Sequence, residues 1–130
     1  MASRADELRA RVRVFAVRVL KLVKTLSRGP TSDAIARQLA WSAPSVSSNY
    51  HSTRRARSRR EFIARMGVVA DEAEETEGWL ELLKQADGAS GAELDWLLNE
   101  SRELRAIFVQ SVKTARLNYQ RSHRSDSVDP

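Results

Sequence analysis

The residues best suited to chemistry in this 130-residue chain are two glutamates, Glu72 and Glu75, which lie one helical turn apart. Paired carboxylates on a bundle helix can hold metal ions, but di-iron sites of that kind also need a Glu-x-x-His motif on two helices. The only histidines are His51 and His123, and neither lies in such a motif. We therefore predict no metal. A half-buried carboxylate requires a cationic partner, so we expect Glu72, Glu75 and Arg37 to form ion pairs between helices or between subunits.

Nucleophilic catalysis has even weaker support. His51 lies near several serines, but an activated serine needs a third residue that orients the histidine, and donors for an oxyanion. Neither is apparent, and no Gly-rich phosphate loop is present. The absence of cysteine excludes disulfides and thiolate ligands and fits a reducing compartment. We predict no catalytic residues, no cofactor and no enzymatic activity.

Arginine and lysine are the other residues with a clear chemical use. The net charge is +5 and the pI is about 10.2, a balance that suggests a polyanionic partner such as nucleic acid. Forked guanidinium donors suit phosphate oxygens. No zinc finger, RNP-type aromatic pair or KH loop is present, so we expect phosphate-led binding with weak sequence specificity. The predicted contacts are Arg11, Arg13, Arg18, Lys21, Lys24, Arg54, Arg55, Arg57, Arg59 and Arg60.

These charges are segregated along the chain. Residues 1–30 hold eight basic and two acidic residues, and residues 54–65 hold six basic and one acidic. Residues 71–100 invert the sign, with ten acidic residues and one lysine. We expect the basic helix ends to form a stripe rather than a cap at one pole. Segregation of this kind serves either polyanion binding or ion pairing within and between subunits.

Four amphipathic helices must position these side chains. Apolar residues recur at alternating steps of four and three, the spacing of a helix with one buried face. Gly29-Pro30 is predicted to end the first helix, Asp87-Gly88 the third, and Ser90 with Glu93 to cap the fourth. The four faces are Leu8, Val12, Phe15, Val19, Leu22 and Leu26; Ile35, Leu39, Ser42, Val46 and Asn49; Phe62, Met66, Val69, Ala73, Thr76, Leu80 and Leu83; and Leu94, Leu97, Leu98, Leu104, Ile107, Phe108 and Val112.

The second helix contains the main irregularity. We predict that it begins at Thr31 or Ser32, that Pro44 kinks it, and that a turn near 54–58 follows. A complete break at Pro44 into two helices is the alternative.

The fold class that follows is all-α, an antiparallel up-down four-helix bundle. We expect residues 1–120 to form the bundle domain, with the last helix ending near Tyr119, and residues 121–130 to form a disordered tail. No apolar run long enough to span a membrane and no signal peptide is apparent, so we expect a cytoplasmic protein.

Several motifs match a known family. They are Arg37-Gln38-Leu39, Ser42-Ala43, Ser45-Val46, Asn49-Tyr50, Ala56-Arg57-Ser58-Arg59, Glu61-Phe62-Ile63, Glu72-Ala73, Glu75-Thr76, Trp79-Leu80-Glu81-Leu82-Leu83 and Ser111-Val112-Lys113-Thr114. With these motifs in this order, residues 6 to 117 of the chain resemble the bacterial four helix bundle protein family. That family is also described as the protein of 23S ribosomal RNA intervening sequences. It departs from that pattern at Trp41, Ser52, Thr53 and Gly78.

The resemblance implies an antiparallel bundle that assembles as a ring, typically a homopentamer. The family is similar to the accessory protein of diversity-generating retroelements, which binds nucleic acid and a reverse transcriptase. The partners it implies are further copies of the chain, a nucleic acid with RNA favoured, and a reverse transcriptase, without a membrane. The alternative function is that of a protein–protein adaptor or scaffold, for which an exposed Trp96 would mark the contact.

Overall fold

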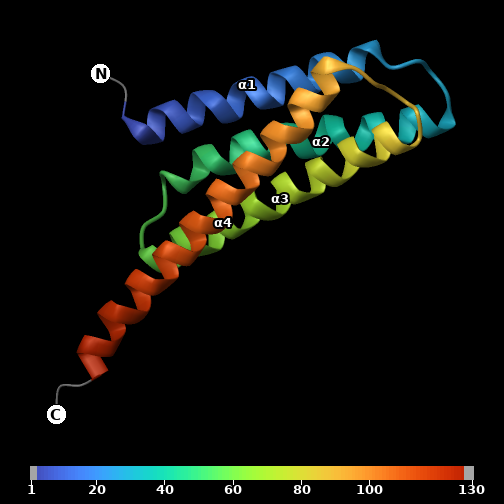
Figure 1. Cartoon of the computed structure of the whole chain (residues 1–130). Coiled ribbons are helices and arrows are strands. Elements are labelled where there is room, and N and C mark those ends of the chain that lie inside the picture. Colours follow the sequence, from blue (N-terminus) through green and yellow to red (C-terminus); the bar gives the residue numbers. More distant parts are fainter. Residues whose placement is uncertain (1–2, 128–130) are drawn as a thin grey trace.

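The structure, a computed structural model, describes the backbone of residues 3–127 and the side chains of residues 3–123. Four helices follow one another: α1 (Arg4–Thr25), α2 (Pro30–Thr53), α3 (Arg59–Gln85) and α4 (Ala92–Ser127). The chain reverses direction at each connection (Figure 1), and the described residues contain no strand. The predicted all-α, antiparallel up-down four-helix bundle is therefore confirmed.

The helix starts follow local capping chemistry. Ser3 caps α1 by accepting a hydrogen bond from the Asp6 amide at 3.1 Å, and Ser58 caps α3 by accepting from the Glu61 amide at 3.0 Å. Two predicted starts are wrong. Gly29 precedes α2, whose first residue is Pro30, and α4 begins after Gly91, whose φ of 110° suits only glycine.

α2 continues through Pro44 without a break, so the alternative of two helices is wrong. Neighbouring side chains bond to the backbone around the proline. The Ser45 hydroxyl donates to the Trp41 carbonyl at 2.8 Å, and the Asn49 amide donates to the Ser45 carbonyl at 2.8 Å. The predicted turn at 54–58 is confirmed, because α2 ends at Thr53 and α3 begins at Arg59.

The core is built from the predicted apolar faces. Phe15 of α1, Leu39 of α2, Leu80 of α3 and Phe108 of α4 are completely buried. One polar contact crosses this core, where the Thr76 hydroxyl donates to Ser42 at 2.9 Å. The remaining fully buried large side chains are Val12, Val19, Val46, Val69, Leu83, Leu94, Leu97 and Leu104.

The last helix is longer than predicted. α4 runs to Ser127 and projects beyond the α2–α3 connection (Figure 1), so the first part of the predicted tail is helical. The Tyr119 and His123 rings stack one turn apart, with centroids 3.9 Å from each other. A helix end outside the bundle needs no apolar face, which is why the polar composition was misleading. Residues 128–130 of that predicted tail lie outside the described residues. No described helix is long and apolar enough to cross a membrane.

Candidate nucleic-acid interface

The basic segments gather at one end of the molecule. The start of α1, the end of α2, the start of α3 and the end of α4 share a pole (Figure 1), because each connection reverses the chain. The predicted stripe is therefore wrong. We call this end the basic pole. Its basic residues are Arg4, Arg9, Arg11, Arg54, Arg55, Arg57, Arg59, Arg60, Arg65, Lys113, Arg116 and Arg121.

Six of the ten predicted phosphate contacts lie at the basic pole, namely Arg11, Arg54, Arg55, Arg57, Arg59 and Arg60. Arg13 and Arg18 lie farther along α1. Lys21 and Lys24 lie at the opposite pole, next to the α3–α4 connection, where α3 and α4 carry acidic residues. The structure therefore divides the predicted set between the two ends of the bundle.

Three predicted contacts already have carboxylate partners. Arg11 donates to both oxygens of Glu100 at 2.9 and 2.6 Å, and also to Glu103 at 2.7 Å. Arg54 forms an ion pair with Asp6, and its hydrogen bond lowers the pKa of that carboxyl. These contacts join α1 to α4 and to the end of α2, so the two guanidinium groups have a structural role.

Arg18 is held in the same way. It donates to both oxygens of Glu93 at 2.8 and 2.7 Å, which lowers the Glu93 pKa. Its guanidinium carbon also lies 3.5 Å from the centre of the Trp96 ring, a cation–π contact. Trp96 is 36% exposed and packed beneath an arginine, whereas Trp41 on α2 is 76% exposed. The more exposed tryptophan is thus not the one that the sequence suggested.

The available guanidinium groups lie around the α2–α3 connection. Arg55, Arg57, Arg59 and Arg60 are exposed and form no ion pair within the described part of the chain. Arg65 stabilises the connection, because it pairs with Glu61 at 2.6 Å and donates to the Ser52 carbonyl at 2.8 Å. Two of these cations lie on the connection and two in the first turn of α3, which makes them the densest group of unpaired guanidinium groups at the basic pole and a candidate phosphate site.

Part of the acidic stretch forms ion pairs between α3 and α4. Glu77, only 8% exposed, accepts from Arg102 at 3.3 Å and from Arg105 at 2.8 Å. Arg102 also bonds Glu81, and Lys84 pairs with Asp95 at 2.7 Å. Sequence reasoning missed the two arginines. The ion pairs could have been predicted from spacing, because the two arginines are three residues apart on α4. Glu77 and Glu81 lie opposite them on the adjacent antiparallel helix.

Glu72, Glu75 and Arg37 do not pair with one another. Burial, together with the negative charges of Glu75 and Asp71, raises the pKa of Glu72. The buried Oε2 of Glu72 has no hydrogen-bond partner among the described residues, and Glu75 only accepts a long 3.4 Å bond from Trp79. The predicted interhelix pairs are therefore absent here, and a pair across subunits stays a prediction. No cluster of three metal-ligating side chains occurs in residues 3–123.

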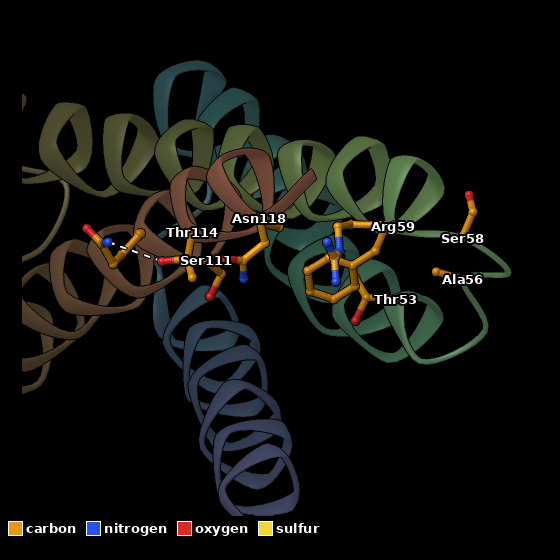
Figure 2. Close-up of a pocket in the computed structure, with 10 residues that line it drawn as sticks. Thr53, Ala56, Ser58, Arg59, Ser111, Thr114 and Asn118 are labelled. Atoms are coloured by element: carbon orange, nitrogen blue, oxygen red, sulfur yellow. Dashed lines mark hydrogen bonds between the residues drawn. The ribbon is translucent and has the colours of Figure 1, made fainter. Parts of the chain in front are cut away.

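A groove opens at the basic pole between α4 and the α2–α3 connection. It has a volume of about 710 Å³, within the range of small-ligand sites. Figure 2 shows Ser111, Thr114 and Asn118 on α4 facing the segment from Thr53 to Arg59. The other lining residues are Ala56, Ser58, Phe62, Gln110 and Ala115. Sequence reasoning missed this groove, although Gln110, Thr114 and Asn118 recur at steps of four along α4.

Comparison with known proteins supports the family resemblance. The chain is similar to a crystal structure of a protein of unknown function from the S23 ribosomal protein family of Bacteroides thetaiotaomicron. The TM-score is 0.77 at 27% identity, over 85% of this chain and 99% of that one. No curated protein matches the chain. The family model of the 23S rRNA-intervening sequence protein matches residues 7–110, and with the shared bundle this places the chain in that family.

Proposed function

We propose that this protein binds RNA without catalysing a reaction, and that it does so as a ring of identical subunits. The observation that carries the proposal is the gathering of three basic segments at one pole, namely the start of α1, residues 54–65 and the end of α4, with unpaired arginines on and beside the turn between α2 and α3. Phosphate oxygens attract such a concentration of cations, and the attraction does not depend on the base sequence.

RNA is favoured over other polyanions because of the family to which the chain belongs, the 23S rRNA-intervening sequence protein family. Arginine rather than lysine dominates the available cations, and its planar donor fork matches phosphate geometry. Binding of this kind releases counterions, so the affinity falls steeply as salt is raised.

The test uses a labelled, structured RNA and fluorescence anisotropy at several salt concentrations. Two double variants reverse the same number of positive charges at opposite poles. R55E/R57E should weaken binding at least about tenfold and reduce the salt dependence. K21E/K24E, at the far pole, should change the affinity less than about threefold. Absence of binding at low salt, indifference to salt, or equal effects of the two variants would each contradict the proposal.

The assembly part of the proposal is tested separately. Trp41, Val14, Val17, Val68 and Leu82 are exposed apolar side chains on α1, α2 and α3, and contact with further subunits would cover such surface. Light scattering coupled to size exclusion should give a mass about five times the 14.7 kDa of one chain. A monomer at micromolar concentration would refute the ring while leaving RNA binding to be decided by the titration.

The second candidate is an adaptor for another protein, such as a reverse transcriptase encoded nearby. Trp41 favours it, because a tryptophan that is 76% exposed is a typical anchor for a protein partner. If the ring forms and leaves Trp41 in solvent, a water-soluble quencher should still reach its fluorescence in a Trp79→Phe and Trp96→Phe background. Protection of Trp41 in the assembled protein would remove the basis for this candidate.

A further inference from the structure

We propose that the bound RNA is an unpaired single strand that follows α4 through three adjoining grooves, with its bases against Phe62 and Tyr119. This inference rests on the proposed RNA binding and specifies the form of the RNA. It begins from a feature that charge alone does not explain: the concave, partly aromatic and amide-rich surface along the C-terminal half of α4.

Neighbouring grooves share lining residues along α4. The first, of about 680 Å³, lies between α1 and α4, and the central groove of about 710 Å³ shares Gln110 and Ser111 with it. The third, of about 460 Å³, shares Ser58 and Arg59 with the central one. The shared residues place the three grooves in one order along α4, which is the path that we propose for the strand. The other lining residues are Arg4, Ala5, Glu7, Leu8, Arg11 and Ile107 in the first groove, and Arg60, Tyr119, Ser122 and His123 in the third.

The polar groups in the path suit base edges. The side chains of Ser111 and Asn118 form no hydrogen bond with other described residues. The Thr114 hydroxyl accepts from Gln110 at 3.3 Å (Figure 2), which leaves its own hydrogen free to donate. An amide offers two donors and one acceptor oxygen, and a hydroxyl offers both roles. The central groove can therefore bond the Watson–Crick edge of an exposed base.

The cations are placed for the phosphates of the same strand. Arg59 borders both the central and the third groove, Arg60 borders the third, and neither forms an ion pair within residues 3–123. The first groove is less favourable to phosphate, because Glu7 lines it and its Arg11 is paired with Glu100. The phosphates should therefore be held mainly at the start of α3.

Two aromatic side chains complete the path. Phe62 is half-buried against the core and lines the central groove. Tyr119 lines the third groove, and its stacking on His123 fixes the ring plane. Stacking of bases on aromatic side chains beside a basic track is the usual way to bind single strands. A duplex stacks its base faces and pairs its Watson–Crick edges, so neither is open to Phe62, Tyr119 or the polar groups of the central groove, and its phosphates are left to contact the arginines at the rim.

The experiment compares a labelled single-stranded RNA of about twelve nucleotides with its blunt duplex, in the same buffer, by fluorescence anisotropy. The single strand should bind about tenfold more tightly. Arg59→Ala should weaken single-strand binding about tenfold, whereas Arg116→Ala, the same charge loss on α4 outside the grooves, should cost less than about threefold. Arg59 lies in the first turn of α3, where a cation opposes the helix dipole, so its removal should not unfold the helix.

The stacking contact has its own control. Tyr119→Leu should weaken binding of the single strand about tenfold and leave the affinity for the duplex unchanged, while Leu117→Ala, on α4 outside the grooves, should change neither affinity.

Equal affinity for single strand and duplex, or equal losses for the two arginine variants, overturns this inference while the proposed function stands. If no RNA binds even at low salt, the proposed function itself fails. If an unstructured polyglutamate peptide binds as tightly as the single-stranded RNA, the cations alone account for binding, and the inferred base contacts are contradicted.

Discussion

At the scale of single residues, the environment of Glu72 opposes its charge. Its buried Oε2 lacks a partner in the described chain, and burial and neighbouring acids raise its pKa above the ordinary value of 4.5. A raised folded pKa means that the folded state binds the proton more tightly than the unfolded state. Stability contributed by protonated Glu72 is therefore complete below pH 4.5 and is lost as the pH rises through the folded pKa.

Glu72→Gln should accordingly stabilise the isolated subunit at pH 7 by on the order of 1 kcal/mol, because it removes the cost of a buried, unpaired charge. The advantage should vanish as the pH falls toward the ordinary carboxyl value. Urea denaturation at several pH values measures it, and Glu75→Gln, whose carboxyl is exposed, should have a smaller effect. If Glu72→Gln instead weakens assembly, the carboxylate pairs with an arginine of another subunit.

Individual contacts were the least predictable part of the molecule. The basic and acidic residues were identified from the sequence, but not which of them meet. Arg11 and Arg18 were predicted to contact phosphates. In the structure both form ion pairs with carboxylates of α4 that are about eighty residues away in sequence. Such pairs depend on helix register, which hydrophobic spacing fixes only to within about a turn. Arg55 and Arg57 remain available because they lie on the α2–α3 connection, and Arg59 and Arg60 because they are exposed in the first turn of α3.

At the scale of elements, ion pairs hold the side of α1 that faces α4. It packs mainly on α2, and its side toward α4 is joined by Arg11 with Glu100 and by Arg18 with Glu93. Arg11→Ala should destabilise the fold by about 1–3 kcal/mol, because Glu100 is then buried without its partner. Arg13→Ala, on the same helix with no ion pair among described residues, should stay within about 0.5 kcal/mol. Hydrogen exchange should show the loss first in α1.

α2 contains a proline, Pro44, in its interior, where this residue normally destabilises a helix. Pro44 removes one backbone hydrogen bond and crowds the preceding turn. Pro44→Ala should raise the stability of the bundle by about 1–3 kcal/mol, and Ser48→Ala, on the exposed side of the same helix, should be nearly neutral. Thermal unfolding followed by circular dichroism decides this. A loss of stability on replacing Pro44 would mean that the neighbouring helices pack around the kink that the sequence predicts at this proline.

The helices themselves were largely predictable, because apolar residues repeat every three or four positions in the sequence and the buried faces consist mainly of those residues. Their ends were less so. Ser90 has the chemistry of a cap, yet the chain needs the positive φ of Gly91 before α4 can begin. The extension of α4 to Ser127 left no apolar signal, since a helix end beyond the bundle has nothing to pack against. The third groove, lined by Tyr119, Ser122 and His123, depends on that extension, so the sequence alone did not predict it.

At the scale of the whole molecule, the distribution of charge was known from the sequence and its geometry was not. Residues 1–30 and 54–65 read as two separate basic segments. The alternation of chain direction places the start of one beside the other, together with the end of α4. The same alternation places the end of α3 with Lys84, the connection with Asp87, and the start of α4 with Glu93 and Asp95 at the far pole. Topology thus converts a charge pattern along the chain into a difference between two ends.

That difference has a kinetic consequence. A molecule with opposite poles of unequal charge has a permanent dipole moment, and the field of a polyanion turns it before the surfaces touch. Most encounters should then begin in the productive orientation. Stopped-flow mixing with RNA should show an association rate constant that falls steeply with added salt, while the dissociation rate constant changes much less. The dipole moment of the bundle would orient the protein in the field of the RNA during its approach.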